Sequence, residues 1–547
     1  MFRATLLSLY TLGLLVSSTP AHAQSLHMGL LAHWPLRTDA ADTSLNGFNG
    51  NPIGVTFDGN DGARFDGRTS YIEVPHAAGL NLGEGDFTIS AWIHTEADLD
   101  DTLGDLVTKY DPASRKGLNF GIMNYHGVVN AQSNYRNVFF GLDNGAESEG
   151  WKDCGRPGNA VYPMSLCVYD GALYAGTFEI GREETGHVYK YAGGDQWEDC
   201  GVPYGSNAIS ALAVHKGELY AAASHYRSGG SALGDAGNEL FGGRVFRYKG
   251  GKNWEDCGKL GEIEAIYGLT TYKGQLYASS LYAPAGFYRY EGGTTWTDLG
   301  NPGGRVEALG VHNGYVLGTG FDADHSGVYR YDNPGWTDCG APPDTTQTYS
   351  FMQHQGELFV GSWPSGKVFV LGEPGQWQDR GRLGEEKESM GMAVYNGKLY
   401  GGTLPLAQVY RYDGGTTWTN TGQLDTTPDV QYRRAWSMAV FQGKLFCGVL
   451  PSGRVLSYET GRCISRDYEL PSGWVHLAAQ RKGIMMNLYL NGKLVNEASH
   501  ANLNIDNEAP IKIGLGQHDY FNGRMKDLMI HNRALDDAEI AALAEKR

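Results

Sequence analysis

A short aromatic phrase that recurs along the middle of the chain constrains the fold more than any other feature. A Trp followed by a polar run and a Gly occurs at Trp151, Trp197, Trp254, Trp296, Trp336, Trp377 and Trp418. The later marks are about 41 residues apart, and alternating polar and apolar runs such as 398–403 and 409–412 lie between them. Gly-Gly, Asn-Gly and Lys-Gly pairs, which favour hairpin turns, separate these runs. Four short strands per unit predict an all-β chain with a β-propeller, and seven marks predict seven blades.

The two ends of the repeat region complement each other. The last unit, residues 434–460, has three strand patterns, and the strand that carries Trp151 has no unit before it. We therefore predict that the Trp151 strand becomes the fourth strand of the last unit and closes the ring, which buries two sheet edges. The entry and exit of the propeller then lie side by side, as an inserted domain requires.

The N-terminus predicts export. Residues 1–23 resemble a signal peptide, with Arg3, an apolar run over 6–16 and an Ala-His-Ala cleavage site at 21–23. A retained anchor is the alternative. The sequence has no other long apolar stretch, so we expect a secreted, periplasmic or cell-surface protein without a transmembrane segment. The net charge of −17 argues against a nucleic-acid partner.

The cysteines do not form a disulfide framework. The chain has seven, and four of them (Cys154, Cys200, Cys257 and Cys339) occupy the same repeat position, three residues after the Trp. Equivalent positions in different blades are too far apart to be bridged. We expect these side chains to act as small buried apolar groups.

The segments that flank the repeats have a different pattern, and together they resemble one domain family. The first flank carries Phe-Asp-Gly at 65–67, Tyr-Ile-Glu-Val-Pro at 71–75 and Phe-Thr-Ile-Ser-Ala-Trp-Ile at 87–93. The second carries Trp-Val-His-Leu at 474–477, Leu-Tyr-Leu-Asn-Gly at 488–492 and Phe-Asn-Gly at 521–523, before a predicted helix over 536–543. These motifs resemble the LamG-like, concanavalin A-type jelly roll. The resemblance implies a jelly roll built from residues 24–149 and 463–547, with the propeller inserted at 150–462.

The same resemblance suggests a ligand class for the jelly roll. Many domains of this family bind glycans, some of them through calcium, and others are adhesive. Asp58, Asn60, Asp61 and Asp66 offer oxygen ligands that suit Ca²⁺. The alternative is that these residues only form turns.

The loops that depart from the repeat predict a site at the propeller mouth. Loops between second and third strands share one face with the blade connections, and there the sequence becomes irregular. We assign His225, Tyr282, Arg227 and Arg434 as candidate catalytic residues, and Tyr226, His325, Tyr349, Trp363, Tyr432, Arg433 and Trp436 as candidate substrate-binding residues. His215, His312 and His354 share the hairpin position on the opposite face, so we interpret them as structural.

This set matches the needs of eliminative cleavage of an acidic polysaccharide. A cation neutralises the uronate carboxylate, and His and Tyr supply a base and an acid. Seven-bladed propellers host several polysaccharide lyase families, including ulvan lyases built on His, Tyr and Arg, and the resemblance to these is at the level of the fold.

Three alternatives remain open. One is a non-catalytic, lectin-like glycan-binding protein, and another is an adhesive surface protein. The third is a hydrolase that uses two of Asp322, Asp324, Glu385 and Glu388, although these acids lie in loops that are typical of solvated turns.

Overall fold

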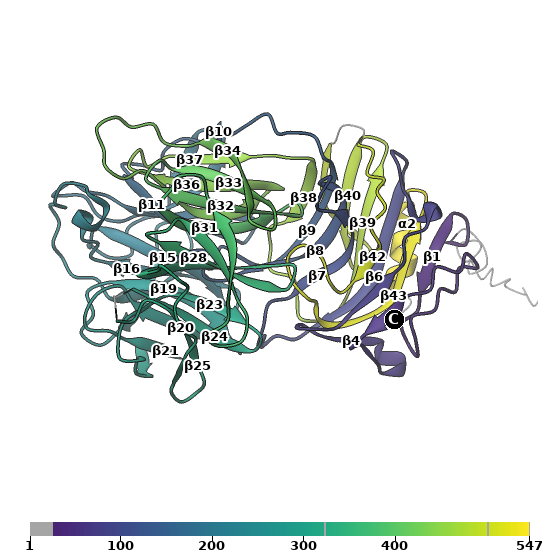
Figure 1. Cartoon of the computed structure of the whole chain (residues 1–547), viewed down its shortest axis with the longest axis horizontal. Coiled ribbons are helices and arrows are strands. Elements are labelled where there is room, and N and C mark those ends of the chain that lie inside the picture. Colours follow the sequence, from purple (N-terminus) through teal and green to yellow (C-terminus); the bar gives the residue numbers. More distant parts are fainter. Residues whose placement is uncertain (1–25, 322–323, 500–502, 546–547) are drawn as a thin grey trace, which may run out of the picture.

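The structure, a computed structural model, describes residues 26–321, 324–499 and 503–545. The predicted signal peptide, residues 1–23, lies outside these ranges. The all-β fold class is confirmed: a β-propeller lies beside a jelly-roll sandwich (Figure 1). In Figure 1 the first strands (purple) and the last strands (yellow) lie together in one lobe, and the middle of the chain (teal and green) forms the other. Within the described ranges, no helix is long and apolar enough to cross a membrane.

The jelly roll consists of two antiparallel sheets that both flanks of the chain build together. The first sheet has the order β3 (Thr56–Phe57), β4 (Ala63–Asp66), β43 (Asn522–His531), β6 (Phe87–Thr95), β39 (Gly473–Lys482), β40 (Met485–Leu490) and β41 (Lys493–Ser499), with β1 (Leu30–Trp34) also paired to β43. The second has the order β2 (Asn51–Ile53), β5 (Tyr71–Val74), β42 (Ile511–Ile513), β7 (Gly104–Asp111), β8 (Lys116–Tyr125), β9 (Asn134–Asn144) and β38 (Arg462–Arg466). Alternate side chains of both sheets, among them Trp34, Phe65 and Phe140, form one apolar core.

Short helices accompany the sheets. Three are 3-10 turns: η1 (Gly59–Asp61), η2 (Ala78–Leu80) and η3 (Ser228–Ser231). The predicted C-terminal helix is α2 (Asp537–Glu545). The side chain of Asp536 accepts from the Glu539 N–H (2.8 Å), and the Glu539 carboxylate accepts from the Asp536 N–H (2.9 Å). This reciprocal capping box makes Asp536 the N-cap of α2.

The propeller is built from repeated four-stranded meanders. Its inner strands are β11 (Tyr162–Tyr169), β15 (Ala208–His215), β19 (Ile266–Tyr272), β23 (Val306–His312), β27 (Gln347–His354), β31 (Glu388–Tyr395) and β35 (Arg434–Phe441). The second strands are β12 (Ala172–Phe178), β16 (Glu218–Ser224), β20 (Gln275–Ser280), β24 (Tyr315–Gly320), β28 (Glu357–Trp363), β32 (Lys398–Leu404) and β36 (Lys444–Leu450). The third strands are β13 (Val188–Gly193), β17 (Arg244–Tyr248), β21 (Phe287–Gly292), β25 (Val328–Tyr331), β29 (Lys367–Leu371), β33 (Gln408–Gly414) and β37 (Val455–Tyr458). The outer strands are β14 (Gln196–Asp199), β18 (Trp254–Lys259), β22 (Thr295–Asp298), β26 (Trp336–Asp338), β30 (Trp377–Arg382), β34 (Thr417–Gln423) and β10 (Lys152–Asp153).

The prediction of seven separate blades is wrong. In the described residues, five four-stranded sheets stand alone, and the first two repeat units are continuous in one eight-stranded sheet. The physical reason is that the end of β12 pairs with the start of β15 through Phe178 and Ala208, which joins the two meanders at a single point. The repeated Trp gives the number of repeat units, but it does not show whether strands of neighbouring units pair with each other.

The predicted closure of the ring is confirmed. The β10 strand directly after Trp151 pairs antiparallel with β37, with Lys152 opposite Ser457 and Asp153 opposite Leu456. The last unit thereby gains its fourth strand from the start of the propeller, and the outer side of β37 is paired over Leu456 and Ser457.

The repeated Trp and Cys form a link between successive units. The indole N–H of Trp197 donates to the carbonyl of Cys154 (2.9 Å), and Trp254 donates in the same way to Cys200 (2.9 Å). Trp296 repeats this bond with Cys257 (2.8 Å). All seven cysteines are buried and unpaired, so the interpretation as small buried groups is confirmed.

The hairpins between first and second strands face the jelly roll. Lys273 N–H donates to the Leu99 carbonyl (2.7 Å), and Gly171 N–H donates to the Asp467 carbonyl (2.9 Å). The buried ion pair between Lys398 and Asp143 also joins the two domains. This contact covers the hairpin face and leaves the face with the irregular loops free.

A jelly-roll hairpin also fills the centre of the propeller. The β8–β9 connection reaches the inner strands, where Asn130 Nδ2 donates to the Ser210 carbonyl (2.7 Å). Two further backbone bonds hold it: the N–H of Phe351 to the carbonyl of Gly127 (2.9 Å), and the N–H of Val168 to the carbonyl of Ser133 (2.8 Å). The hairpin therefore forms the floor of the propeller mouth.

Candidate functional site

Two layers of side chains from the inner strands line the mouth. In each unit these are the residues five and seven positions before the last residue of the inner strand. The pairing of each inner strand with its neighbour shifts register at or next to these two positions. The layer nearer the floor is Met164, Ser210, Tyr267, Glu307, Tyr349, Met390 and Trp436. The layer nearer the opening is Tyr162, Ala208, Ala265, Arg305, Gln347, Glu388 and Arg434. The apolar and aromatic members pack in one cluster.

Arg434 lies near the middle of this lining, under the loop of the second unit. Its Nη1 donates to Ser231 Oγ (2.5 Å) and its Nη2 donates to the Gly230 carbonyl (3.4 Å). The guanidinium carbon is 5.6 Å from the ring centroid of Tyr432 and 5.9 Å from that of Trp436. Because Arg434 is only 7% exposed, its guanidinium binds the loop of the second unit and has little contact with solvent.

Glu388 lies in the same layer and corrects one interpretation of the sequence. The side chain is 2% exposed, so it is not part of a solvated turn. Burial raises the pKa of Glu388 to about 7, although the neighbouring Arg434 and Tyr349 both lower it. Its Oε1 has no hydrogen-bond partner within the described part of the chain. Of the other acids considered with it, Glu385 and Asp324 are exposed, and Asp322 lies outside the described residues.

A second polar group occupies the rim and is open to solvent. The Nδ1 atom of His225 is 3.0 Å from Oε2 of Glu264, and the guanidinium of Arg227 pairs with the other oxygen of the same carboxylate. The backbone N–H of Arg227 donates to the hydroxyl of Tyr282 (3.0 Å), and its guanidinium lies 4.6 Å from the Tyr282 ring centroid. Thus three of the four predicted catalytic residues, His225, Arg227 and Tyr282, are brought together.

The chemistry of the rim group follows from these contacts. The Nδ1–H of His225 donates to Glu264, which leaves Nε2 as the basic ring nitrogen. Burial raises the pKa of Tyr282 above its ordinary value, so its hydroxyl keeps its proton at neutral pH. The side chain of Arg227 is 59% exposed and that of His225 is 13% exposed. An anionic ligand can therefore reach the guanidinium first.

The predicted substrate-binding residues are divided between the centre and the edge. Tyr226 contacts the lining at Tyr162 (ring centroids 5.9 Å apart). Trp363 and Tyr432 meet edge to face, with centroids 6.4 Å apart, and both are partly exposed.

The remaining members of the set have other contacts. Tyr349 and Trp436 are buried in the lining. His325 lies against Tyr329 with ring centroids 6.3 Å apart, and Arg433 donates through Nε to the Thr427 carbonyl (2.7 Å). Arg227, Arg433 and Arg434 consequently do not gather into one open cationic patch.

Sequence reasoning missed Glu264, Ser231 and Glu307. Glu307, and the place of Glu388 in the lining, could have been found by aligning the units on their hairpin residue, since all lining residues stand five or seven positions before it. Glu264 lies one position outside that pattern, and Ser231 is in a loop of irregular length. Only the folded loop brings these two to Arg227 and Arg434.

Three of the four residues considered for calcium, Asp58, Asn60 and Asp66, are engaged elsewhere. Asp58 pairs with Arg524 (2.7 Å) and Asn60 accepts from Arg37 (2.9 Å). Asp66 accepts from the backbone of Thr69 and Ser70 (2.9 Å each), and these and further hydrogen bonds hold its pKa well below the usual range. Their geometry is that of turn and ion-pair residues and gives no support to a calcium site.

Comparisons with known proteins agree with the fold. The Laminin_G_3 family, described as the Concanavalin A-like lectin/glucanases superfamily, matches residues 417–541. That match covers the C-terminal strands of the jelly roll and begins in β34 of the propeller. No curated protein matches the sequence. A propeller combined with a concanavalin A-like jelly roll is compatible with a carbohydrate-related function.

Solved structures resemble the chain only at low sequence identity and low TM-score. A catalytically inactive virginiamycin B lyase from Staphylococcus aureus with quinupristin is 10% identical, with a TM-score of 0.45, and covers 56% of this chain and 98% of its own. The WD40 β-propeller domain of Doa1 is 13% identical, with a TM-score of 0.41, and covers 57% of this chain and 97% of its own. At this level of similarity, what those proteins do says nothing about this chain.

Proposed function

We propose that the chain is an exported polysaccharide lyase that cleaves an acidic, uronate-containing polysaccharide by β-elimination at the rim of the propeller mouth. The observation that carries this proposal is the contact of His225 and Arg227 with one carboxylate, Glu264, beside Tyr282. A base oriented by a carboxylate, an accessible cation and a protonated hydroxyl are the groups that this reaction needs.

Arg227, His225 and Tyr282 together supply every group that the elimination needs. Arg227 binds the uronate carboxylate and makes the neighbouring C–H more acidic, because it stabilises the charge that develops as the proton leaves. Nε2 of His225 takes that proton, and the electron pair forms the new C=C bond. The adjacent C–O bond breaks, and the leaving glycosidic oxygen takes a proton from Tyr282. The product carries an unsaturated uronate at its new non-reducing end.

A second candidate is glycan binding without cleavage. It is favoured by the charge balance of the mouth, since Glu264 already pairs with Arg227 and the other mouth arginines have partners of their own. In that case the partly exposed Trp363 and Tyr432 bind a sugar by stacking. A hydrolase is less favoured, because Glu307 and Glu388 are 1% and 2% exposed and a sugar cannot reach them without displacing the lining.

The test is an assay on a panel of acidic polysaccharides: ulvan, alginate, pectate and glycosaminoglycans. Purified protein is incubated with each, and the ultraviolet absorbance of the unsaturated uronate is followed. A rise that Arg227→Ala removes supports the lyase. No rise, together with retarded migration in gels that contain one of these polymers, supports glycan binding, and no response in either assay contradicts both.

A further inference from the structure

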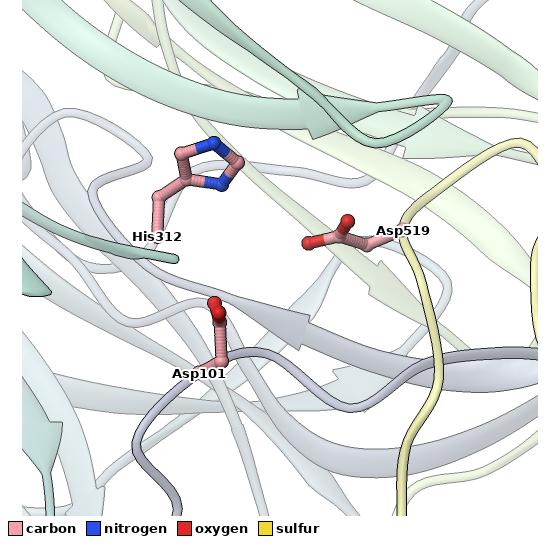
Figure 2. A group of neighbouring side chains, drawn as sticks. All are labelled: Asp101, His312 and Asp519. Atoms are coloured by element: carbon pink, nitrogen blue, oxygen red, sulfur yellow. The ribbon is translucent and has the colours of Figure 1, made fainter. Parts of the chain in front are cut away.

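Three side chains from both domains converge where the propeller meets the jelly roll. Asp101 lies between β6 and β7, Asp519 lies between β42 and β43, and His312 is the last residue of β23. One ligand atom of each lies within 4.8 Å of the others. Figure 2 shows both carboxylates and the imidazole directed toward a common point.

The two carboxylates are held in place and almost fully buried. Asp519 accepts from the Thr102 hydroxyl (2.5 Å) and from the Tyr520 N–H (2.8 Å). Asp101 accepts from the Thr102 N–H (3.0 Å) and from the Asn313 N–H (3.1 Å). Both acids are only 1% exposed. Two facing carboxylates at this depth are costly unless a cation compensates them.

The protein itself provides only a partial counter-charge. Arg68 lies 3.5 Å from Asp101, its side chain is 41% exposed, and it is shared with Asp100 at 3.4 Å. At that distance and exposure its contribution is small.

The imidazole points to a metal as the missing partner. His312 Nδ1 is buried and has no hydrogen-bond partner within the described residues. In Figure 2 it lies on the side of the ring that faces the carboxylates. The other ring nitrogen, Nε2, is 3.0 Å from Nδ2 of the Asn313 side chain. Turning that amide by 180° puts its oxygen in place to accept from Nε2–H, and Nδ1 then has the lone pair that a metal requires.

We propose that Asp101, His312 and Asp519 bind a divalent transition-metal ion of the zinc type and that this ion clamps the propeller to the jelly roll. One imidazole and two carboxylates suit Zn²⁺, whereas Ca²⁺ takes six or more oxygen ligands. Tetrahedral ligands about 2.0–2.2 Å from zinc are about 3.4 Å apart, so the three side chains draw inward by on the order of 1 Å on binding.

The test uses the full-length protein, stripped with a chelator and then loaded with Zn²⁺. Metal content after gel filtration is measured by mass spectrometry, and Co²⁺ in place of zinc is followed by visible absorbance. We expect one tightly held zinc per chain. His312→Gln and Asp519→Asn should weaken binding by at least about 100-fold, because loss of a direct ligand costs no less than loss of an outer-sphere partner.

The matched control is His215→Gln. His215 has the same place at the end of its inner strand and also a buried Nδ1 without a partner within the described residues, but it belongs to no such group of ligands. This variant should bind zinc as the wild type does. Circular dichroism checks that each variant folds. If His312→Gln does not fold, Asp519→Asn is used as the test variant in its place. The proposal is overturned if the wild type holds no more zinc than a folded His312→Gln or Asp519→Asn chain, or if Co²⁺ gives no absorbance that these variants lose.

Discussion

The indole nitrogen of Trp436 donates a hydrogen bond to Oδ1 of Asn130 at 2.9 Å, so the lining of the propeller mouth is bonded to a hairpin of the jelly roll. The same indole also lies 3.0 Å from the Met164 carbonyl. The two domains therefore share the floor of the candidate site, and the jelly roll supports the mouth in addition to covering the opposite face.

Replacing Asn130 by Ala should destabilise the propeller and the jelly roll together. The change removes buried bonds to Trp436 and to the Ser210 carbonyl; the indole keeps its contact with the Met164 carbonyl, and the Ser210 carbonyl loses this donor. We expect unfolding free energy to fall by about 1–3 kcal/mol in urea denaturation. Asn253→Ala, at an exposed turn, is the control and should change little. Equal stability of the two variants would show that the hairpin does not hold the mouth.

The repeated Trp should matter through its N–H as well as through its ring. Trp254→Phe loses the bond to the Cys200 carbonyl, whereas Trp336 has an indole nitrogen without a partner within the described residues. Trp254→Phe should therefore cost about 1 kcal/mol more than Trp336→Phe in the same denaturation experiment. If the two substitutions cost the same, the link between successive units contributes nothing to stability.

Glu388 should make stability depend on pH. Its folded pKa of about 7 lies above the ordinary value of 4.5, so the folded state binds the proton more tightly. That contribution is complete below pH 4.5 and is lost as pH rises through 7. The stability of the wild type relative to Glu388→Gln should thus fall by about 3 kcal/mol over this range. Glu385→Gln, whose side chain is 98% exposed, should show no such trend relative to the wild type. A flat difference for Glu388→Gln would contradict the raised pKa.

The aromatic edge of the mouth should contribute to sugar binding. Trp363→Ala and Tyr432→Ala remove the two partly exposed rings that meet there. We expect each to weaken binding of a responsive polysaccharide by roughly 5–30-fold in affinity electrophoresis, the range of a residue that carries 1–2 kcal/mol. Tyr468→Ala removes a 49% exposed ring beside the jelly roll and should leave binding unchanged. Loss in Tyr468→Ala alone would place the sugar on the jelly roll.

The parts of the structure that repeat could be predicted from the sequence, and the parts that depend on long-range contact could not. Strand period and turn residues predict the meanders, and the three-stranded last unit predicts its completion by β10. The pairing of Phe178 with Ala208 has no signature in the sequence, because one bridge between units needs no special residue.

The candidate site divides in the same way. His225, Arg227 and Tyr282 stood out because their loops break the repeat. Their shared partner, Glu264, did not. His312 was interpreted as a structural residue because it occupies a repeat position, and only the docking of the jelly roll brings Asp101 and Asp519 to it.

The most direct test of the account compares His225→Ala with His187→Ala in the unsaturated-uronate assay. His187 is also bonded through Nδ1 to a carboxylate, Asp199 at 3.0 Å, and its side chain is 23% exposed, but it is not part of the rim group. With both variants folded, we predict that His225→Ala lowers the rate by about 10²–10⁴-fold and that His187→Ala retains the wild-type rate. A wild type that produces no unsaturated uronate from any acidic polysaccharide, or a His225→Ala variant as fast as the wild type, would contradict the proposed lyase.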